Sequence, residues 1–159
     1  MAELTPLDEK LGEVLGLAQA AQAATQRVGK MEDAEEFADT LERMAAEAAE
    51  TERRTEELVG GIDGKKTAIH DKARETKSEA AEMMKTYLEG EEEALDGFEF
   101  LAMAEAGELC HWEIVQTMAG KLDAADVREL ADWAVDVQRG HVEAVRKASL
   151  SLAEAEAVG

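Results

Sequence analysis

Apolar residues recur at intervals of three and four along nearly the whole chain, which is the spacing of one face of an α-helix. The pattern breaks at Gly60–Gly61, at Gly90 and at Gly120, and glycine commonly ends helices. No segment shows the strict alternation of apolar and polar residues that is typical of a half-buried strand. The sequence therefore predicts five helices, over residues 7–29, 32–59, 65–89, 91–120 and 123–156.

Two of the predicted helices begin with specific signals. Pro6 stands at the first turn of the first helix, where its missing N–H does no harm. Asp123 precedes the last apolar stripe and is a residue type that caps helix N-termini well. The third helix is the weakest prediction, because its polar face is wide.

Long helices joined by short turns pack as antiparallel neighbours, so we expect an all-α bundle that forms one domain over residues 1–159. The predicted core contains much alanine, which lets helices approach closely but buries little area per residue. Such a core gains from burying more surface between copies. We therefore expect a homo-oligomer, most simply a dimer.

Composition limits where and with what the chain works. A single cysteine, Cys110, excludes an internal disulfide and a cysteine-based zinc cluster, and we expect its thiol to be buried as a small apolar group. Nothing reaches 18 consecutive apolar residues, and no charged segment followed by an apolar run opens the chain. The sequence therefore predicts a cytoplasmic protein that does not enter membranes.

Acidic residues outnumber basic ones by 37 to 17, which gives a formal net charge of −20. A chain this acidic repels phosphate backbones, so we expect no nucleic-acid partner. Exposed carboxylates at this density also repel one another over about 10 Å at 0.1 M salt. Two readings stay open: adaptation to a salty cell interior, or an alanine- and glutamate-rich helical composition from a high-GC genome.

Polar residues on the buried stripes are the most informative feature, because an unpaired buried charge is expensive. Glu105 and Glu108 fall on the apolar stripe of the fourth helix, and His111 follows Glu108 by one turn. The stripe of the fifth helix passes through His141, with Gln138 one turn before it. Several helices are thus expected to point polar side chains at one interior level.

The second and first helices add weaker candidates at the same level. Glu47 and Glu50 lie beside the stripe of the second helix, and Glu52 falls on its edge. Gln19 and Gln22 occupy the corresponding place on the first helix.

Carboxylates and imidazoles inside a four-helix bundle are the ligands of di-iron and di-manganese sites. Carboxylate oxygens are hard and can bridge two ions, and a neutral imidazole adds a terminal nitrogen. The sequence therefore offers a metal set for iron or manganese: Glu47, Glu50, Glu105, Glu108, His111 and His141. Each also has a plainer reading, since glutamates beside a stripe are commonly solvated and a core histidine is commonly just hydrogen-bonded.

The order of these features resembles the ferritin-like superfamily, and more narrowly its YciE/YciF-like group. The segments that carry the resemblance are EAAETERRTEEL (47–58), YLEGEEEALDGF (87–98) and AEAGELCHWEIVQTM (104–118). The resemblance implies a four-helix bundle with an additional helix in the connection between the second and third core helices. It also implies metal binding in a group linked with stress responses.

The chain departs from the di-iron pattern at several positions. The first helix offers Gln19 and Gln22 in place of a clear glutamate, and Gln138 replaces the carboxylate expected one turn before His141. Amides bridge metal ions poorly, so we expect a depleted site rather than a complete oxidase centre. The alternative is a structural or interaction bundle whose interior polar groups pair with one another. No nucleophile elbow or phosphate-binding loop indicates a hydrolase.

Overall fold

The computed structural model describes residues 3–159, and the all-α prediction is confirmed for that range. Its only β-type contact there is an isolated bridge between Glu32 and Glu93. The helices are α1 (Pro6–Gly29), the short 3₁₀ helix η1 (Glu35–Phe37), α2 (Ala38–Gly60), α3 (Lys66–Leu88), α4 (Ala94–Lys121) and α5 (Ala125–Val158).

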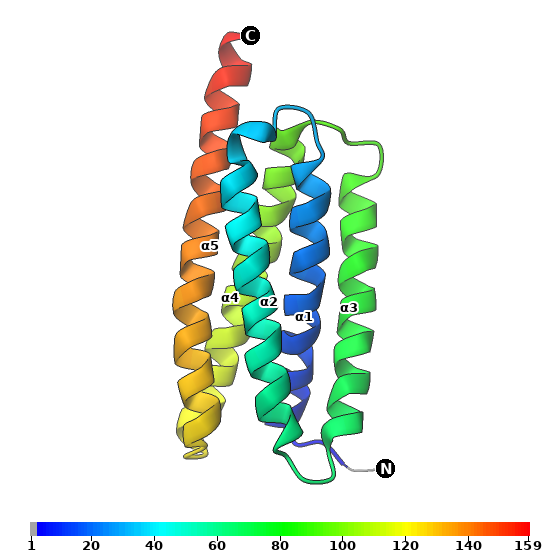
Figure 1. Cartoon of the computed structure of the whole chain (residues 1–159), viewed down its shortest axis with the longest axis vertical. Helices are drawn as coiled ribbons and strands as arrows, with labels where there is room; N and C mark the ends of the chain where they lie inside the picture. The colour runs from blue at the N-terminus through cyan, green and yellow to red at the C-terminus, as the bar shows by residue number, and fades with distance from the viewer. Residues whose placement is uncertain (1–2) are drawn as a thin grey trace.

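The five long helices lie nearly parallel to one axis (Figure 1). The helices α1, α3 and α5 run in one direction, and α2 and α4 run in the other. The most extensive contacts join α4 to α5 and join α1 to α3, α2 and α4. Four helices (α1, α2, α4 and α5) therefore form the bundle, while α3 packs on the outside of α1 and carries the chain back to the end where α4 begins.

The start of α1 follows the sequence signals closely. Pro6 is its first residue, and Thr5 and Asp8 form a reciprocal capping box in which each side chain accepts a hydrogen bond from the other's backbone N–H. Asp8 also accepts a 2.7 Å hydrogen bond from Lys65, which ties the start of α1 to the turn before α3.

Two other predicted helix starts are wrong. Asp123 is not the cap of α5, because it lies in the left-handed turn that precedes the helix, with φ 54°. The helix begins at Ala125, after Ala124 in the capping position. The second helix begins at Ala38 rather than at residue 32, because Asp33 adopts φ 65° and residues 35–37 form η1 instead.

Contact between α1 and α3 depends on glycine. A Cβ atom added at Gly16 would lie 2.4 Å from the carbonyl oxygen of Ala73, and one added at Gly12 would lie 2.9 Å from that of Ile69. Backbone atoms cannot yield as a flexible side chain can. Gly12 and Gly16 therefore set how closely α3 approaches α1.

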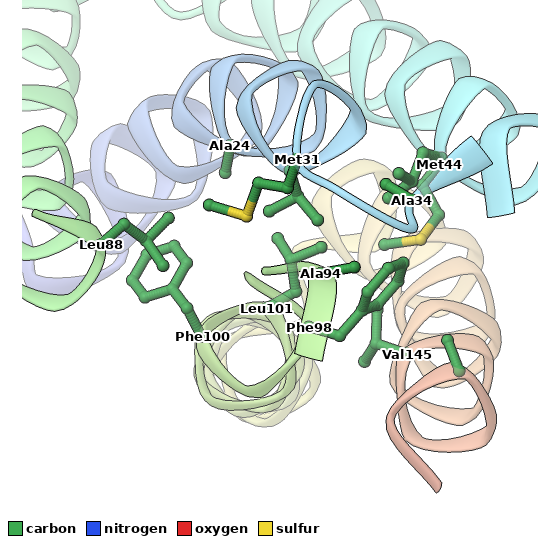
Figure 2. Close-up of a cluster of buried hydrophobic side chains, with 13 residues drawn as sticks. Ala24, Met31, Ala34, Met44, Leu88, Ala94, Phe98, Phe100, Leu101 and Val145 are labelled. Atoms are coloured by element: carbon green, nitrogen blue, oxygen red, sulfur yellow. The ribbon is translucent and has the colours of Figure 1, made fainter. Parts of the chain in front are cut away.

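Two apolar clusters fill the bundle, one towards each end. Figure 2 shows the first, around Phe98, Leu101, Met44 and Val145, and the ring of Phe98 meets that of partly buried Phe37 edge-on at 5.2 Å. The second cluster surrounds Trp112 and includes residues of α1, α4 and α5. Along α4 and α5 the two clusters are separated by a few buried polar residues, which we call the polar layer: Glu105, Glu108, Gln138 and His141.

The outer surface differs from expectation at two places. Cys110 is exposed on α4, and not buried as expected. Its position in the helix lies opposite the face that carries Glu108 and Trp112, so the apolar residues around it in sequence do not cover it. Across residues 3–159, every helix falls short of the length or the apolar character that crossing a membrane requires.

Candidate functional site

The polar layer occupies the interior level that the sequence predicted. Glu105, Glu108 and His141 are 2%, 4% and 1% exposed, and Gln138 is buried beside them. Glu105 and Glu108 are placed by α4, one turn apart, and Gln138 and His141 are placed by α5, also one turn apart. Each pair replaces one turn of the apolar stripe, so the regular helices bring all four side chains into the same slice of the bundle.

His141 lies between carboxylates from two other helices. Its Nε2 is 2.9 Å from Oε1 of Glu47 on α2, and its Nδ1 is 3.9 Å from Oε2 of Glu105 on α4. A carboxylate only accepts hydrogen bonds, so Nε2 carries a proton. Burial on its own lowers the pKa of His141, but the nearby carboxylates of Glu105 and Glu47 outweigh it and leave the pKa above its ordinary value.

Glu105 is held on its other side by Gln138. The amide of Gln138 donates a 2.8 Å hydrogen bond to Oε2 of Glu105 and a longer one, 3.4 Å, to its backbone carbonyl. The glutamine that replaces the expected carboxylate thus supplies a donor where a second anion would have repelled Glu105. The sequence showed the substitution, but its partner became visible only in the fold.

Glu108 lacks any comparable partner. Its Oε2 is out of contact with solvent and has no hydrogen-bond partner, and the same holds for Nδ1 of His141 and Nε1 of Trp112. Burial, and then the neighbouring charge of Glu105, raise the pKa of Glu108 well above its ordinary value. A buried carboxyl in this state favours the neutral acid or a bound cation.

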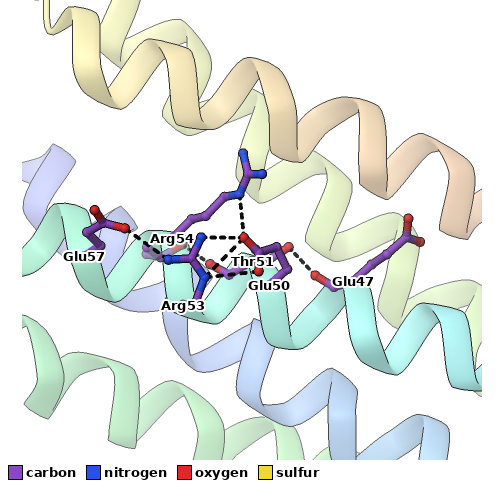
Figure 3. Close-up of polar contacts among 7 residues, drawn as sticks. Glu47, Glu50, Thr51, Arg53, Arg54 and Glu57 are labelled. Carbon is purple, nitrogen blue, oxygen red and sulfur yellow. Dashed lines mark hydrogen bonds and ion pairs between the residues drawn. The ribbon is translucent and has the colours of Figure 1, made fainter.

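Glu50 does not reach the polar layer. It lies on the outer face of α2, where Arg53 and Arg54 donate hydrogen bonds to it at 2.6–3.2 Å (Figure 3). Hydrogen bonds from these two guanidinium groups lower its pKa to about 2. Glu50 is therefore engaged in a surface ion-pair ladder that Glu57 extends at 3.2 Å.

His111 also points away from the layer. Its Nδ1 is 2.9 Å from the carbonyl oxygen of Gly107, and its Nε2 is 3.8 Å from Glu13 of α1. The side chain is 37% exposed. Although His111 follows Glu108 by three residues, the helix turns it to a neighbouring face, so the Glu-x-x-His spacing does not bring both to one centre.

Residues of α1 form a separate polar bridge to α2. The amides of Gln19 and Gln22 donate hydrogen bonds of 3.0 and 2.8 Å to the carboxylate of Glu52. Together they satisfy both of its oxygens. No carboxylate of α1 enters the polar layer in the structure of residues 3–159.

Whether the layer suits a cation depends on its spacing. Within residues 3–159 no group of three or more His, Cys, Asp or Glu side chains is already gathered as closely as metal ligands are. Two residues of the polar layer come close to the spacing of metal ligands, since Nδ1 of His141 and Oε2 of Glu105 are 3.9 Å apart. Two bonds of about 2.1 Å, typical for nitrogen and oxygen ligands, span up to about 4.2 Å, so one ion fits between these atoms.

Comparison with protein-family models, with curated proteins and with solved structures finds no match to this chain. Its function is therefore inferred from its own residues and their geometry.

Proposed function

We propose that this chain is a cytoplasmic, ferritin-like bundle of the YciE/YciF-like type that binds an iron or manganese ion in a depleted di-metal site, in a role linked with stress. The observation that carries the proposal is the gap between Nδ1 of His141 and Oε2 of Glu105. The two atoms are buried, face each other at 3.9 Å, and Nδ1 has no hydrogen-bond partner. A lone pair opposite a carboxylate is unfavourable unless a proton or a metal ion lies between them.

The course of the chain supports the ferritin-like part of the proposal. Along the chain, one hairpin (α1 and α2) is followed by α3, which packs outside α1 and returns the chain to the other end of the bundle, and then by a second hairpin (α4 and α5) (Figure 1). Bundles of the ferritin type contain one long crossover of this kind, and their ligands project inward from facing helices. Here α4 and α5 supply the inward polar residues.

The layer provides a reasonable, though small, ligand set. Glu105 and His141 are the first two ligands, and Glu108, with its free Oε2, is the third. Glu47 accepts a hydrogen bond from the N–H at Nε2 and so orients His141, as carboxylates behind metal-bound histidines commonly do. With Gln138 in place of a carboxylate, the charge of the layer suits one divalent ion better than two. An iron or manganese ion held there supplies Lewis-acid and redox chemistry.

Metal uptake by the untagged protein tests the proposal. The double variant Glu105→Gln/His141→Gln replaces the carboxylate and the imidazole that face the gap with neutral amides, which are poor metal ligands. The matched control Glu50→Gln/His111→Gln makes the same two changes outside the polar layer. After chelation and dialysis against Fe(II) under anaerobic conditions, or against Mn(II), elemental analysis gives the metal bound per chain.

We expect about one equivalent in the wild type and in the control, and less than about a tenth in the inner variant. Circular dichroism checks that each variant is folded. Less than about a tenth of an equivalent in the wild type would overturn the proposal, and so would equal uptake by both double variants.

A second candidate function is a structural or interaction bundle without metal. The observation that favours it is the pairing already present, since His141 contacts Glu47 at 2.9 Å and Gln138 contacts Glu105 at 2.8 Å. In this case the imidazolium of His141 takes the place of the cation. The inner double variant would then change stability alone, with no metal bound to any of the proteins.

A further inference from the structure

An apolar cavity opens between α1, α3 and α4. Its volume is about 80 Å³. Alanines from all three helices make up half of its lining residues, and Leu17, Met84 and Leu101 are among the others. The cavity is roughly half the volume of one that accepts benzene (~150 Å³), so about three to five non-hydrogen atoms of a guest can lie inside it.

Two carboxylates of the polar layer form the inner wall of this cavity. Glu105 is already engaged with Gln138, whereas Glu108 also lines the cavity, and its Oε2, although shielded from solvent, has no hydrogen-bond partner. The other polar side chains in the lining are those of Glu105 and Lys77. A buried acceptor without a donor costs free energy, and a guest that brings a donor removes that cost.

The outer wall carries the opposite charge. Lys77 of α3 lines the cavity and is exposed to solvent, whereas Glu108 lies at 4% exposure on the opposite helix. The lining thus has an anionic inner end, an apolar middle and a cationic outer end. This order of groups defines the chemistry of a complementary guest.

We propose that the cavity binds a short aliphatic ammonium ion, whose N–H groups meet Glu108 and whose carbon chain lies against the alanines. A guest that also carries a carboxylate at its far end, as an ω-amino acid does, gains a second contact with Lys77. The proposal goes beyond metal binding and requires no metal. An ammonium and a metal ion would, however, use the same carboxylate, that of Glu108.

Other small molecules fit the lining less well. An alcohol of equal length donates one hydrogen bond but brings no charge to the carboxylate. A quaternary ammonium has the charge but no N–H donor. Water lacks partners, since it needs two to four polar groups and the walls are mostly apolar.

Titration of the chelator-treated chain of residues 1–159 with n-butylammonium, monitored by calorimetry and by ligand-observed NMR, tests the proposal. Because the chain has a net charge of −20, any cation gathers near its surface, and tetramethylammonium measures that background. We expect saturable binding of n-butylammonium with a Kd of about 0.1–10 mM, and no saturation with tetramethylammonium or 1-butanol.

Three variants locate the binding. Glu108→Gln is expected to weaken n-butylammonium binding at least about tenfold. Glu99→Gln removes the same charge from an exposed position of α4 and is expected to change nothing. Ala80→Leu keeps every charge but fills the cavity, and is expected to abolish binding. Melting curves show that each variant is folded.

A fourth arm identifies the kind of ammonium. If the natural guest has a carboxylate, 4-aminobutanoate binds the wild type more tightly than n-butylammonium, and Lys77→Ala removes the difference. If it is a simple alkylammonium, the two bind equally. The proposal is overturned if n-butylammonium binds no better than tetramethylammonium, or if Glu99→Gln weakens binding as much as Glu108→Gln. Because metal is absent throughout, these outcomes do not depend on whether the metal site exists.

Discussion

At His141 a single imidazole contacts carboxylates from two neighbouring helices, and it is the only buried cationic group that the polar layer of residues 3–159 contains. Its pKa lies above the ordinary value despite burial, since Glu105 and Glu47 favour the protonated ring. The ring therefore links α5 to α2 and α4. Its removal leaves Glu105 buried without a positive partner.

Replacement of His141 tests this link. In metal-free protein we expect His141→Leu to lower the free energy of unfolding by about 3 kcal/mol at pH 6, because breaking a buried ion pair leaves an uncompensated charge. The folded protein binds the imidazolium proton more tightly than the unfolded chain. The stabilisation is therefore complete below the unfolded pKa of about 6.5 and is lost as pH rises through the folded pKa.

Urea unfolding at pH 6 and pH 9 measures the difference in free energy of unfolding between the wild type and His141→Leu, which should be smaller at pH 9. Adding Glu105→Gln should recover part of the loss, since the stranded charge is then absent. His111→Leu, on the exposed ring, should change stability by less than about 0.5 kcal/mol. Equal losses at both pH values would contradict an imidazolium at His141.

Glu108 is expected to destabilise the metal-free fold at neutral pH. Its raised pKa means that the folded state favours the neutral acid. The neutral acid therefore contributes to the free energy of unfolding fully below the pKa of the unfolded chain, about 4.5, and this contribution is lost as pH rises through the folded pKa. Glu108→Met, which is similar in volume, should therefore stabilise the chain by about 1–3 kcal/mol at pH 8.

Urea unfolding in chelator across pH 4.5 to 8 measures this gain, which should fall towards zero at the acidic end. The same change at exposed Glu99 serves as the control and should have little effect at any pH. A gain that does not depend on pH would mean that packing, rather than the carboxyl charge, explains it.

Among the elements, α3 is held to the bundle by its close approach to α1. Gly16→Ala would normally help a helix by about 0.5–1 kcal/mol, but here the new methyl group meets the carbonyl of Ala73. We expect a loss of about 1–3 kcal/mol and faster amide exchange confined to α3 and the facing turn of α1. Gly107→Ala, where nothing lies within 4 Å, should stabilise the chain instead.

Hydrogen exchange by mass spectrometry and thermal melts compare the two variants. The same Gly→Ala change is thus expected to lower the free energy of unfolding at Gly16 and to raise it at Gly107. A stabilised Gly16→Ala protein would show that the contact between α1 and α3 is looser than the structure indicates.

Periodicity predicted the helices and most of the core, because burial of one helical face leaves a regular trace in the sequence. It placed Glu105, Glu108 and His141 inside correctly for the same reason. It could not orient Glu50 and His111, whose outward contacts depend on the neighbouring Arg53, Arg54 and Glu13. The predicted helix starts at residues 32 and 123 are wrong because Asp33 and Asp123 adopt left-handed conformations, which the apolar pattern of the sequence does not reveal.

On the scale of the whole molecule, large apolar side chains remain exposed on α3 and α4. Met83, Tyr87 and Met103 are 58%, 52% and 50% exposed. The predicted dimer would cover them, and light scattering after size exclusion should then give twice the 17.2 kDa of one chain. We expect Tyr87→Glu/Met103→Glu to yield monomers, because facing charges repel in a buried contact. Leu150→Glu, equally exposed on α5, should stay dimeric.

The net charge of −20 sets how the whole fold responds to salt. Folding brings the carboxylates closer together, so their repulsion opposes the compact state until ions screen it. The Debye length falls from about 10 Å at 0.1 M to about 3 Å at 1 M, so screening of the repulsion is nearly complete at 1 M.

We expect the melting temperature to rise with KCl, and that of a salt-adapted chain to continue rising from 1 to 3 M. A plateau near 1 M favours the simpler alanine- and glutamate-rich composition, and no rise at all would contradict salt adaptation. KCl also weakens the exposed ion pairs of Glu50 with Arg53 and Arg54, which lowers the melting temperature. The variant Arg53→Ala lacks part of this ladder, so its melting curves separate the weakening of these ion pairs from the stabilisation that comes from screened repulsion.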